Sequence, residues 1–142
     1  MARVLLVRPL RAAADVDVVH IACHAQFRSD NPRFSALYLA DGALTARDAA
    51  KLRLRSGLVT MSACETGVSQ VLPGNEPVGL TQAFFSAGAA SVLASLWTVQ
   101  DETTATFMAR FYERLRIGRQ PARALRETQI ESLLGNPHPY YW

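Results

Sequence analysis

The chain has 142 residues, 49% of them hydrophobic, which is enough for one domain with a single core and too little for two. Fifteen Lys and Arg against twelve Asp and Glu give a net charge of +3, and the arginines form no dense run, which argues against a nucleic-acid-binding stripe. No apolar run approaches the roughly 18 to 20 residues of a membrane span, so we expect no membrane partner. Two buried-looking cysteines and an N-terminus interrupted by arginines favour a reducing, cytoplasmic compartment.

Two buried strands are predicted in the first half of the chain. Residues 1–15 carry no clear pattern, but residues 17–22 are mostly apolar and β-branched and lead directly to Cys23 and His24. Residues 57–63 form a second such run, which stops abruptly at Cys64. Short apolar runs of this kind are typical of strands that are covered on both faces in a parallel sheet.

The segment between these strands contains a predicted hairpin and helix. Residues 35–39 alternate and meet the turn signal at residues 41–42, which predicts a short strand or hairpin beside the loop after His24. Thr45 with Asp48 resembles a capping box and predicts a helix through Leu52. A βαβ crossover therefore links the two buried strands.

The second half of the chain alternates helix and strand. A loop rich in Gly, Pro and Asn at residues 65–77 comes first, and loops of this length are usually functional. The predicted elements that follow are a helix over 78–87 stopped by Gly88, a strand over 90–96, a helix opened by Thr98 with Asp101, and a helix over 121–134. This alternation predicts an α/β sandwich with a mostly parallel sheet.

His24 and Cys64 are expected just past the carboxyl ends of consecutive strands. Since one crossover joins these strands, both residues should lie at the same edge of the sheet, where α/β proteins collect their ligands. A thiol becomes nucleophilic when a neighbouring base takes its proton, and backbone N–H groups near it can stabilise the oxyanion. The sequence therefore predicts a Cys/His catalytic dyad.

Several boxes in this order also resemble a known family, the CHAT domain of caspase-like peptidases in the separase and caspase clan, often carried behind TPR repeats in bacteria. The boxes, which span roughly residues 16–142, are His20-Ile-Ala-Cys-His24, Ser62-Ala-Cys-Glu-Thr-Gly67, Gly88, Ser91-Val-Leu-Ala-Ser-Leu-Trp97, Asp101, Phe111-Tyr112, Ala124-Leu-Arg126 and His138-Pro-Tyr-Tyr-Trp142. The resemblance implies a three-layer caspase-like sandwich that hydrolyses peptide bonds in a protein or peptide substrate, without metal or cofactor. It also implies a TPR or other sensor domain that regulates the site in the parent protein.

The resemblance assigns roles to individual residues. His24 matches the catalytic histidine and Cys64 the nucleophile, while the backbone N–H groups of Ala25 and Cys64 match the oxyanion donors. The family commonly has glycine where this chain has Ala25, which keeps the N–H but restricts the backbone. The family also has further strands before and after the matched boxes, so residues 1–142 are expected to form a single, partial domain that is incomplete at both ends.

Other interpretations stay open beside these. Cys64 and His24 could be structural, and Cys23 is expected in the core because neighbouring strand residues face opposite ways. Zinc ligation by His20, Cys23, His24 and Cys64 would need a second closely spaced ligand pair, which the sequence lacks.

Two further residues could line a substrate pocket. Trp97 could form a pocket wall or cap the core, and Asp101 could select a basic side chain or stabilise the first turn of its helix. The loop at residues 65–77 is expected to act as a lid that a partner orders. The alternative function is a proteolytically silent interaction module, or an inactive fragment of a larger protein.

Overall fold

A computed structural model describes residues 4–6, 16–28, 30–65, 78–95, 101–135 and 138, with the backbone alone for residues 4–6, 63–65, 78 and 101. The chain divides into two compact units, residues 2–98 and residues 99–142, which are described separately. No helix within the described segments is long and apolar enough to cross a membrane.

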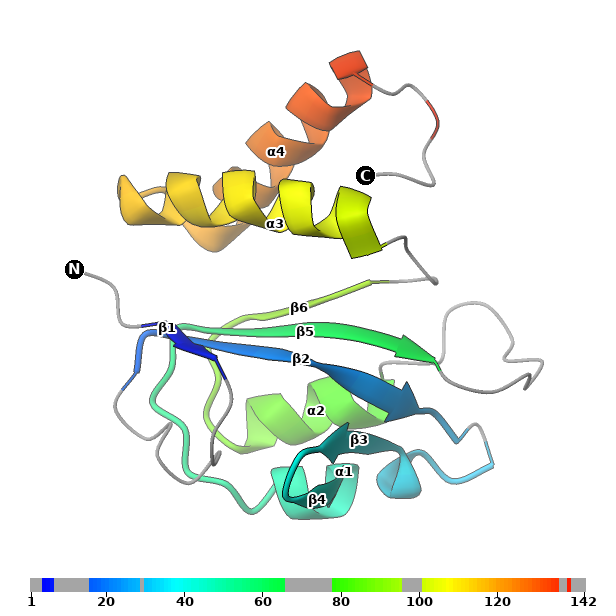
Figure 1. Cartoon of the computed structure of the whole chain (residues 1–142). Helices are drawn as coiled ribbons and strands as arrows, with labels where there is room; N and C mark the ends of the chain where they lie inside the picture. The colour runs from blue at the N-terminus through cyan, green and yellow to red at the C-terminus, as the bar shows by residue number, and fades with distance from the viewer. Residues whose placement is uncertain are drawn as a thin grey trace. The chain divides into compact units, whose positions relative to one another are not determined.

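The first unit is built on a mixed sheet (Figure 1). Its described strands run in the spatial order β4 (Gly42–Thr45), β3 (Ala36–Leu39), β2 (Val18–Gln26), β5 (Leu58–Glu65) and β6 (Val92–Ala94), and β1 (Val4–Leu6) also pairs with β2. The β1–β2, β2–β5 and β5–β6 pairs are parallel, whereas β3 pairs antiparallel with both β2 and β4. The predicted α/β class with a mostly parallel sheet is confirmed, as in a caspase-like sandwich.

The two strands that carry the candidate dyad are longer than predicted. β2 continues through His24 to Gln26, and β5 continues through Cys64 to Glu65, so both residues lie inside strands and not just past them. The physical reason is pairing: residues 24–26 of β2 bond to β3 on one side, and residues 24–25 also lie beside the end of β5. Polar residues therefore stay extended where the sequence alone suggests a loop.

The predicted hairpin is confirmed as β3 and β4, but the helix after it is shorter than predicted. Thr45 caps α1 (Ala46–Ala49), and its Oγ1 accepts a hydrogen bond from the Asp48 N–H at 3.2 Å. The chain leaves the helix after one turn because Leu54 is buried and its N–H donates to the carbonyl of Ala87 at 2.7 Å. The short 3₁₀ helix η2 (Pro32–Phe34) precedes β3.

The core of this unit lies between the sheet and α2 (Val78–Ser86). Figure 1 shows α1 and α2 on the same side of the sheet. Leu80, Ala83, Phe84 and Ala87 recur at helical spacing and are all buried in one cluster, which also contains buried side chains from β2, β3 and β5. One face of β2 therefore packs in this core.

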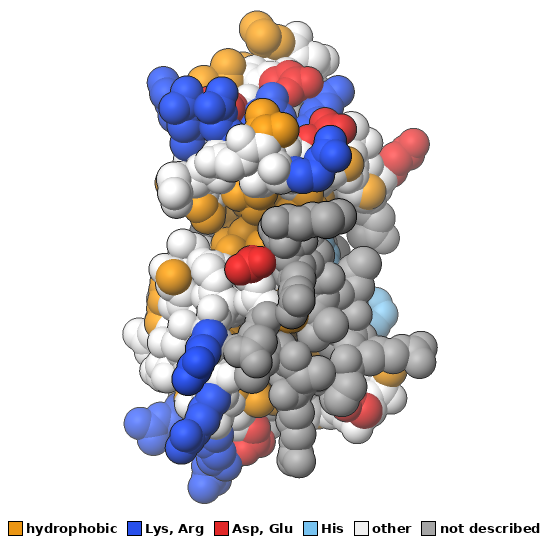
Figure 2. Space-filling model, turned by 90° about the vertical axis from the view of Figure 1, so that its left-hand side faces the viewer, with side chains coloured by type: hydrophobic (Ala, Val, Ile, Leu, Met, Phe, Trp, Pro, Cys, Tyr) orange, Lys and Arg blue, Asp and Glu red, His pale blue; other side chains and the backbone are white. Residues whose placement is uncertain are grey.

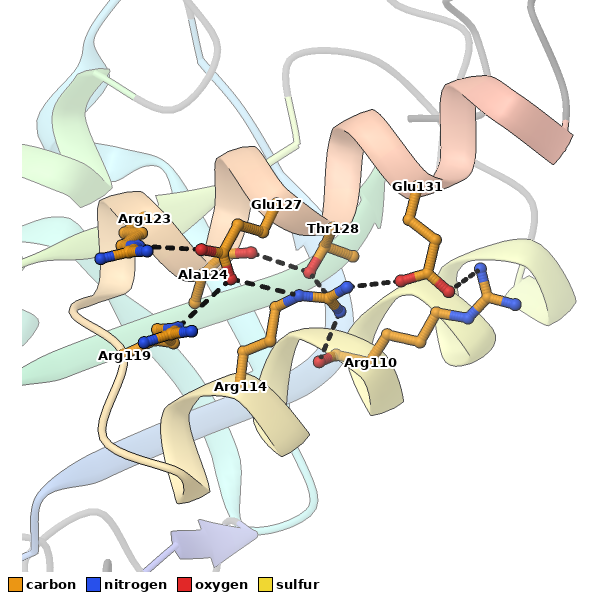
Figure 3. A network of polar contacts seen from close by, with 8 residues as sticks. All are labelled: Arg110, Arg114, Arg119, Arg123, Ala124, Glu127, Thr128 and Glu131. Atoms are coloured by element: carbon orange, nitrogen blue, oxygen red, sulfur yellow. Dashed lines mark hydrogen bonds and ion pairs between the residues drawn. The ribbon is translucent and has the colours of Figure 1, made fainter.

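The second unit contains α3 (Asp101–Arg116) and α4 (Pro121–Gly135), which pack against each other. Figure 3 shows ion pairs and hydrogen bonds that join them, in which Glu127 and Glu131 of α4 face arginines of both helices and of the connecting segment. Arg114 is central, because it contacts both glutamates and the buried Thr128 hydroxyl. The members of this network are Arg110, Arg114, Arg119, Arg123, Glu127, Thr128 and Glu131.

Charged side chains of both signs lie on the protein surface (Figure 2). Figure 2 shows basic and acidic side chains close together on the face that it displays. Such mixing is typical of a solvated protein surface.

Candidate active site

The strand register brings the positions of His24 and Cys64 side by side. β2 and β5 are neighbours, and His24 lies directly opposite Cys64 in their parallel pairing, which agrees with the predicted shared edge of the sheet. Neighbouring strands lie about 4.8 Å apart, and residues opposite each other belong to the same face of the sheet. The two positions therefore share one face near the carboxyl ends of both strands.

Alternation along β2 separates this face from the core. Val19, Ile21 and Ala25 are fully buried in the core cluster, while His24 and Gln26, on the opposite face, are exposed. An exposed imidazole can meet a substrate and exchange protons with it, which a base needs. His24 has this accessibility.

His20 shares the face of His24 but is half-buried. Burial lowers the pKa of the His20 imidazole, because removal from water disfavours the charged form. The His20 imidazole is therefore held toward its neutral form. Along β2, His20 lies four positions before the position paired with Cys64.

Cys23 lies on the opposite face of β2 from both histidines and packs, half-buried, against the core cluster. Burial raises the pKa of its thiol, and a hydrogen bond from the Tyr38 backbone opposes this with a smaller effect. A raised pKa leaves less thiolate at neutral pH, so Cys23 is a poor nucleophile. Its orientation also separates it from the two histidines that a shared zinc site would need, and the described residues contain no group of three potential metal ligands.

Ala25, the expected oxyanion donor, is buried within β2. It lies between Leu37 of β3 and Glu65 of β5, at the last paired position of β5. A backbone N–H at the end of a ladder can point past the neighbouring strand, where an oxyanion would sit. Its role as a donor stays a prediction.

The other predicted pocket residues are only partly described. Trp97 and most of the loop at residues 65–77 lie outside the described residues. Asp101 is the first residue of α3, where an acidic residue is favoured by the helix dipole. Both interpretations of Asp101, pocket residue and helix-stabilising residue, stay predictions.

Two neighbours of His24 were missed by the sequence analysis. Tyr38 of β3 lies directly opposite His24 in the antiparallel pairing, and its hydroxyl donates to Gln26 Oε1 at 2.7 Å. Both side chains are exposed. Alternation in residues 35–39 could have placed Tyr38 on the solvent face, but only the register shows that its neighbour is His24.

The face around His24 carries no fixed charge at its described strand positions. From His20 onward these positions are occupied by histidine, alanine and uncharged polar or apolar residues: His20, Ala22, His24, Gln26, Ala36, Tyr38, Ala43, Thr45, Thr60, Ser62, Cys64 and Leu93. The described positions of this face are therefore uncharged, and two of them, Ala36 and Thr60, are buried.

Comparison with known proteins agrees with the resemblance seen in the sequence. The CHAT domain family matches residues 4–142. Tetratricopeptide repeat protein 28 from Homo sapiens and from Mus musculus are each 35% identical to the chain over 101 residues, which is 70% of this chain. The chain spans only 4% of the length of these relatives.

Proposed function

The chain belongs to the CHAT domain family, and we propose that it is a caspase-like cysteine endopeptidase domain in which His24 and Cys64 form the catalytic dyad. The observation that carries this proposal is the pairing of His24 with Cys64 on neighbouring parallel strands. Neighbouring positions on one face of two paired strands are where a base and a thiol can approach each other, which supports the proposal.

The proposed reaction has two stages. The His24 imidazole takes the thiol proton, and the thiolate attacks the carbonyl carbon of the scissile peptide bond. The oxyanion is stabilised by the backbone N–H groups of Cys64 and Ala25. The carbon–nitrogen bond then breaks, the imidazolium gives its proton to the leaving amine, and a thioester on Cys64 remains.

Water completes the cycle. His24 takes a proton from a water molecule as the water attacks the thioester carbonyl, and the thiolate leaves and recovers the proton. The product acid is released, and the dyad returns to its starting state. Every proton and bond in this scheme is supplied by the two side chains, the substrate and water, so neither metal nor cofactor takes part.

The site is proposed to be regulated within a larger protein. The relatives are named for tetratricopeptide repeats, which supports a TPR or other sensor domain as a partner of this domain in its parent protein. Such a domain would order the loop at residues 65–77, which directly follows Cys64. Trp97, after β6, is proposed to wall the substrate pocket.

A mutant cycle on the parent protein tests the dyad. Cys64→Ala and His24→Ala should each reduce kcat for peptide cleavage by about 10³-fold or more, and the double mutant should lose no more than either single mutant, because members of one catalytic unit are not additive. Cys23→Ala is the matched control, since this neighbouring thiol packs on the core face, and it should retain activity.

Two results would count against the proposal. If the His24→Ala protein kept most of its activity, a different base would be required. If the wild-type parent cleaved no peptide under any activating condition, yet bound the same partners as Cys64→Ala, the domain would be the proteolytically silent interaction module.

A further inference from the structure

Tyr38 is the side chain that borders His24 on the side away from Cys64. The strand order places β3, β2 and β5 next to one another, and the register aligns Tyr38, His24 and Cys64 in one row across the sheet. Side chains directly opposite each other in an antiparallel pair have Cβ atoms about 4.5 to 5.5 Å apart. The Tyr38 and His24 side chains therefore leave the sheet from neighbouring positions on the same face.

A hydrogen bond holds the Tyr38 ring in place. Its hydroxyl donates to Gln26 Oε1 at 2.7 Å, and Gln26 lies two residues after His24 on the same face of β2. Tyr38 is nevertheless 45% exposed. Single exposed aromatic residues are common on protein surfaces, but this one has a hydrogen-bond partner and stands at the strand position next to the proposed base.

The chemistry of this surface indicates what it can bind. The ring offers an apolar face, and the Gln26 amide keeps its two N–H donors, since its oxygen accepts the tyrosine hydroxyl. No fixed charge occupies the described strand positions around it. Aromatic faces pack well against apolar and aromatic side chains, whereas a charged substrate side chain would find no opposite charge at the described strand positions to pair with.

We infer that Tyr38, positioned by Gln26, is a specificity-determining residue that receives an uncharged, apolar or aromatic side chain of the substrate next to the scissile bond. The inference rests on the proposed function, because it requires a peptide to lie across His24. Gln26 contributes an amide donor to a carbonyl of the same peptide segment. This subsite selects the substrate through packing and not through an ion pair.

A peptide library with every residue varied at each position around the cleavage site tests this subsite on the activated parent protein. The wild type should favour apolar and aromatic residues at one position. Tyr38→Ala should lower kcat/KM for those peptides by roughly tenfold, mainly through KM, and leave peptides with alanine at that position nearly unchanged. Tyr38→Phe, which keeps the ring, should retain the preference.

A charge reversal supplies a readout that a structural role would not produce. Tyr38→Glu should shift the preference at that same position toward Lys and Arg, since the exposed site tolerates a carboxylate. The matched control is Phe85→Ala, an aromatic residue of similar exposure, 49%, on α2, which covers the core face of the sheet. This variant should leave the cleavage profile unchanged.

The outcomes separate the inference from the proposed function. An unchanged profile in both Tyr38→Ala and Tyr38→Glu, with cleavage still abolished by Cys64→Ala, would overturn the inference alone. Full cleavage by Cys64→Ala, or no cleavage by the wild type, would overturn the proposed function and the inference with it. If Tyr38→Glu failed to fold, the comparison of Tyr38→Ala with Tyr38→Phe would still decide.

Discussion

Gly88→Ala should destabilise the first unit strongly, because Gly88 ends α2 in a conformation that side chains rarely adopt. Its φ is +105°, and it forms the centre of a Schellman cap. The Ala89 N–H donates to the Phe84 carbonyl at 3.0 Å, and the Gly88 N–H donates to the Phe85 carbonyl at 3.0 Å. The cap turns the chain from the helix toward β6.

Two costs add at this position. A side chain in the left-handed region costs about 1–2 kcal/mol. A Cβ at Gly88 would also lie 2.3 Å from the carbonyl oxygen of Leu54. This backbone cannot shift freely, because the Leu54 N–H donates to the Ala87 carbonyl at 2.7 Å, and forcing such an overlap costs a further ~1–3 kcal/mol. We expect a total loss of about 2–5 kcal/mol, a large share of the typical 5–15 kcal/mol of a domain.

Gly118→Ala is a matched control in the second unit. Gly118 has a φ of +86° and the same cap, in which Arg119 donates to Arg114 and Gly118 donates to Leu115. A Cβ at Gly118 meets no atom of the described residues within 4 Å, so only the backbone cost of about 1–2 kcal/mol should appear.

The assay is native-state hydrogen exchange in increasing urea, which reports the free energy of opening for each unit separately. Amides of β2 report on the Gly88 variant, and amides of α3 report on the Gly118 variant. Equal losses in the two variants would refute the reasoning, because the contact with Leu54 would then contribute nothing.

Limiting alkylation near neutral pH should label Cys64 before Cys23, since burial raises the pKa of the Cys23 thiol; mass spectrometry that finds Cys23 labelled first would contradict the assignment of the nucleophile. Acid should weaken the pairing of α3 with α4. The hydrogen bond from Arg114 holds the pKa of the Glu131 carboxyl below its ordinary value, so its stabilisation is present above the unfolded pKa and is lost as the pH falls through the folded pKa, below about pH 4. Circular dichroism from pH 7 to pH 2 should show this loss, and Arg114→Met should reduce the pH dependence, whereas Arg126→Met, outside the network, should leave it intact.

The sequence by itself determined the features that depend on local patterns. Apolar, β-branched runs predicted β2 and β5, Thr45 predicted the start of α1, and Gly88 predicted the end of α2. The placement of His24 and Cys64 at one edge of the sheet followed as well, because a single crossover between parallel strands leaves few topologies. The alternation of β2 also placed Cys23 on the core side, away from His24.

Only the tertiary structure decided the features that need a distant partner. Residues 4–6 become a strand by pairing with β2, and residues 24–26 stay extended because β3 lies beside them. α1 ends after one turn because the chain bonds to the end of α2. Tyr38 likewise lies beside His24 through a register that no local pattern encodes. In each case the backbone hydrogen bonds are made with residues far away in the sequence. The conformation of the segment is therefore set by the fold and not by the segment's own residues.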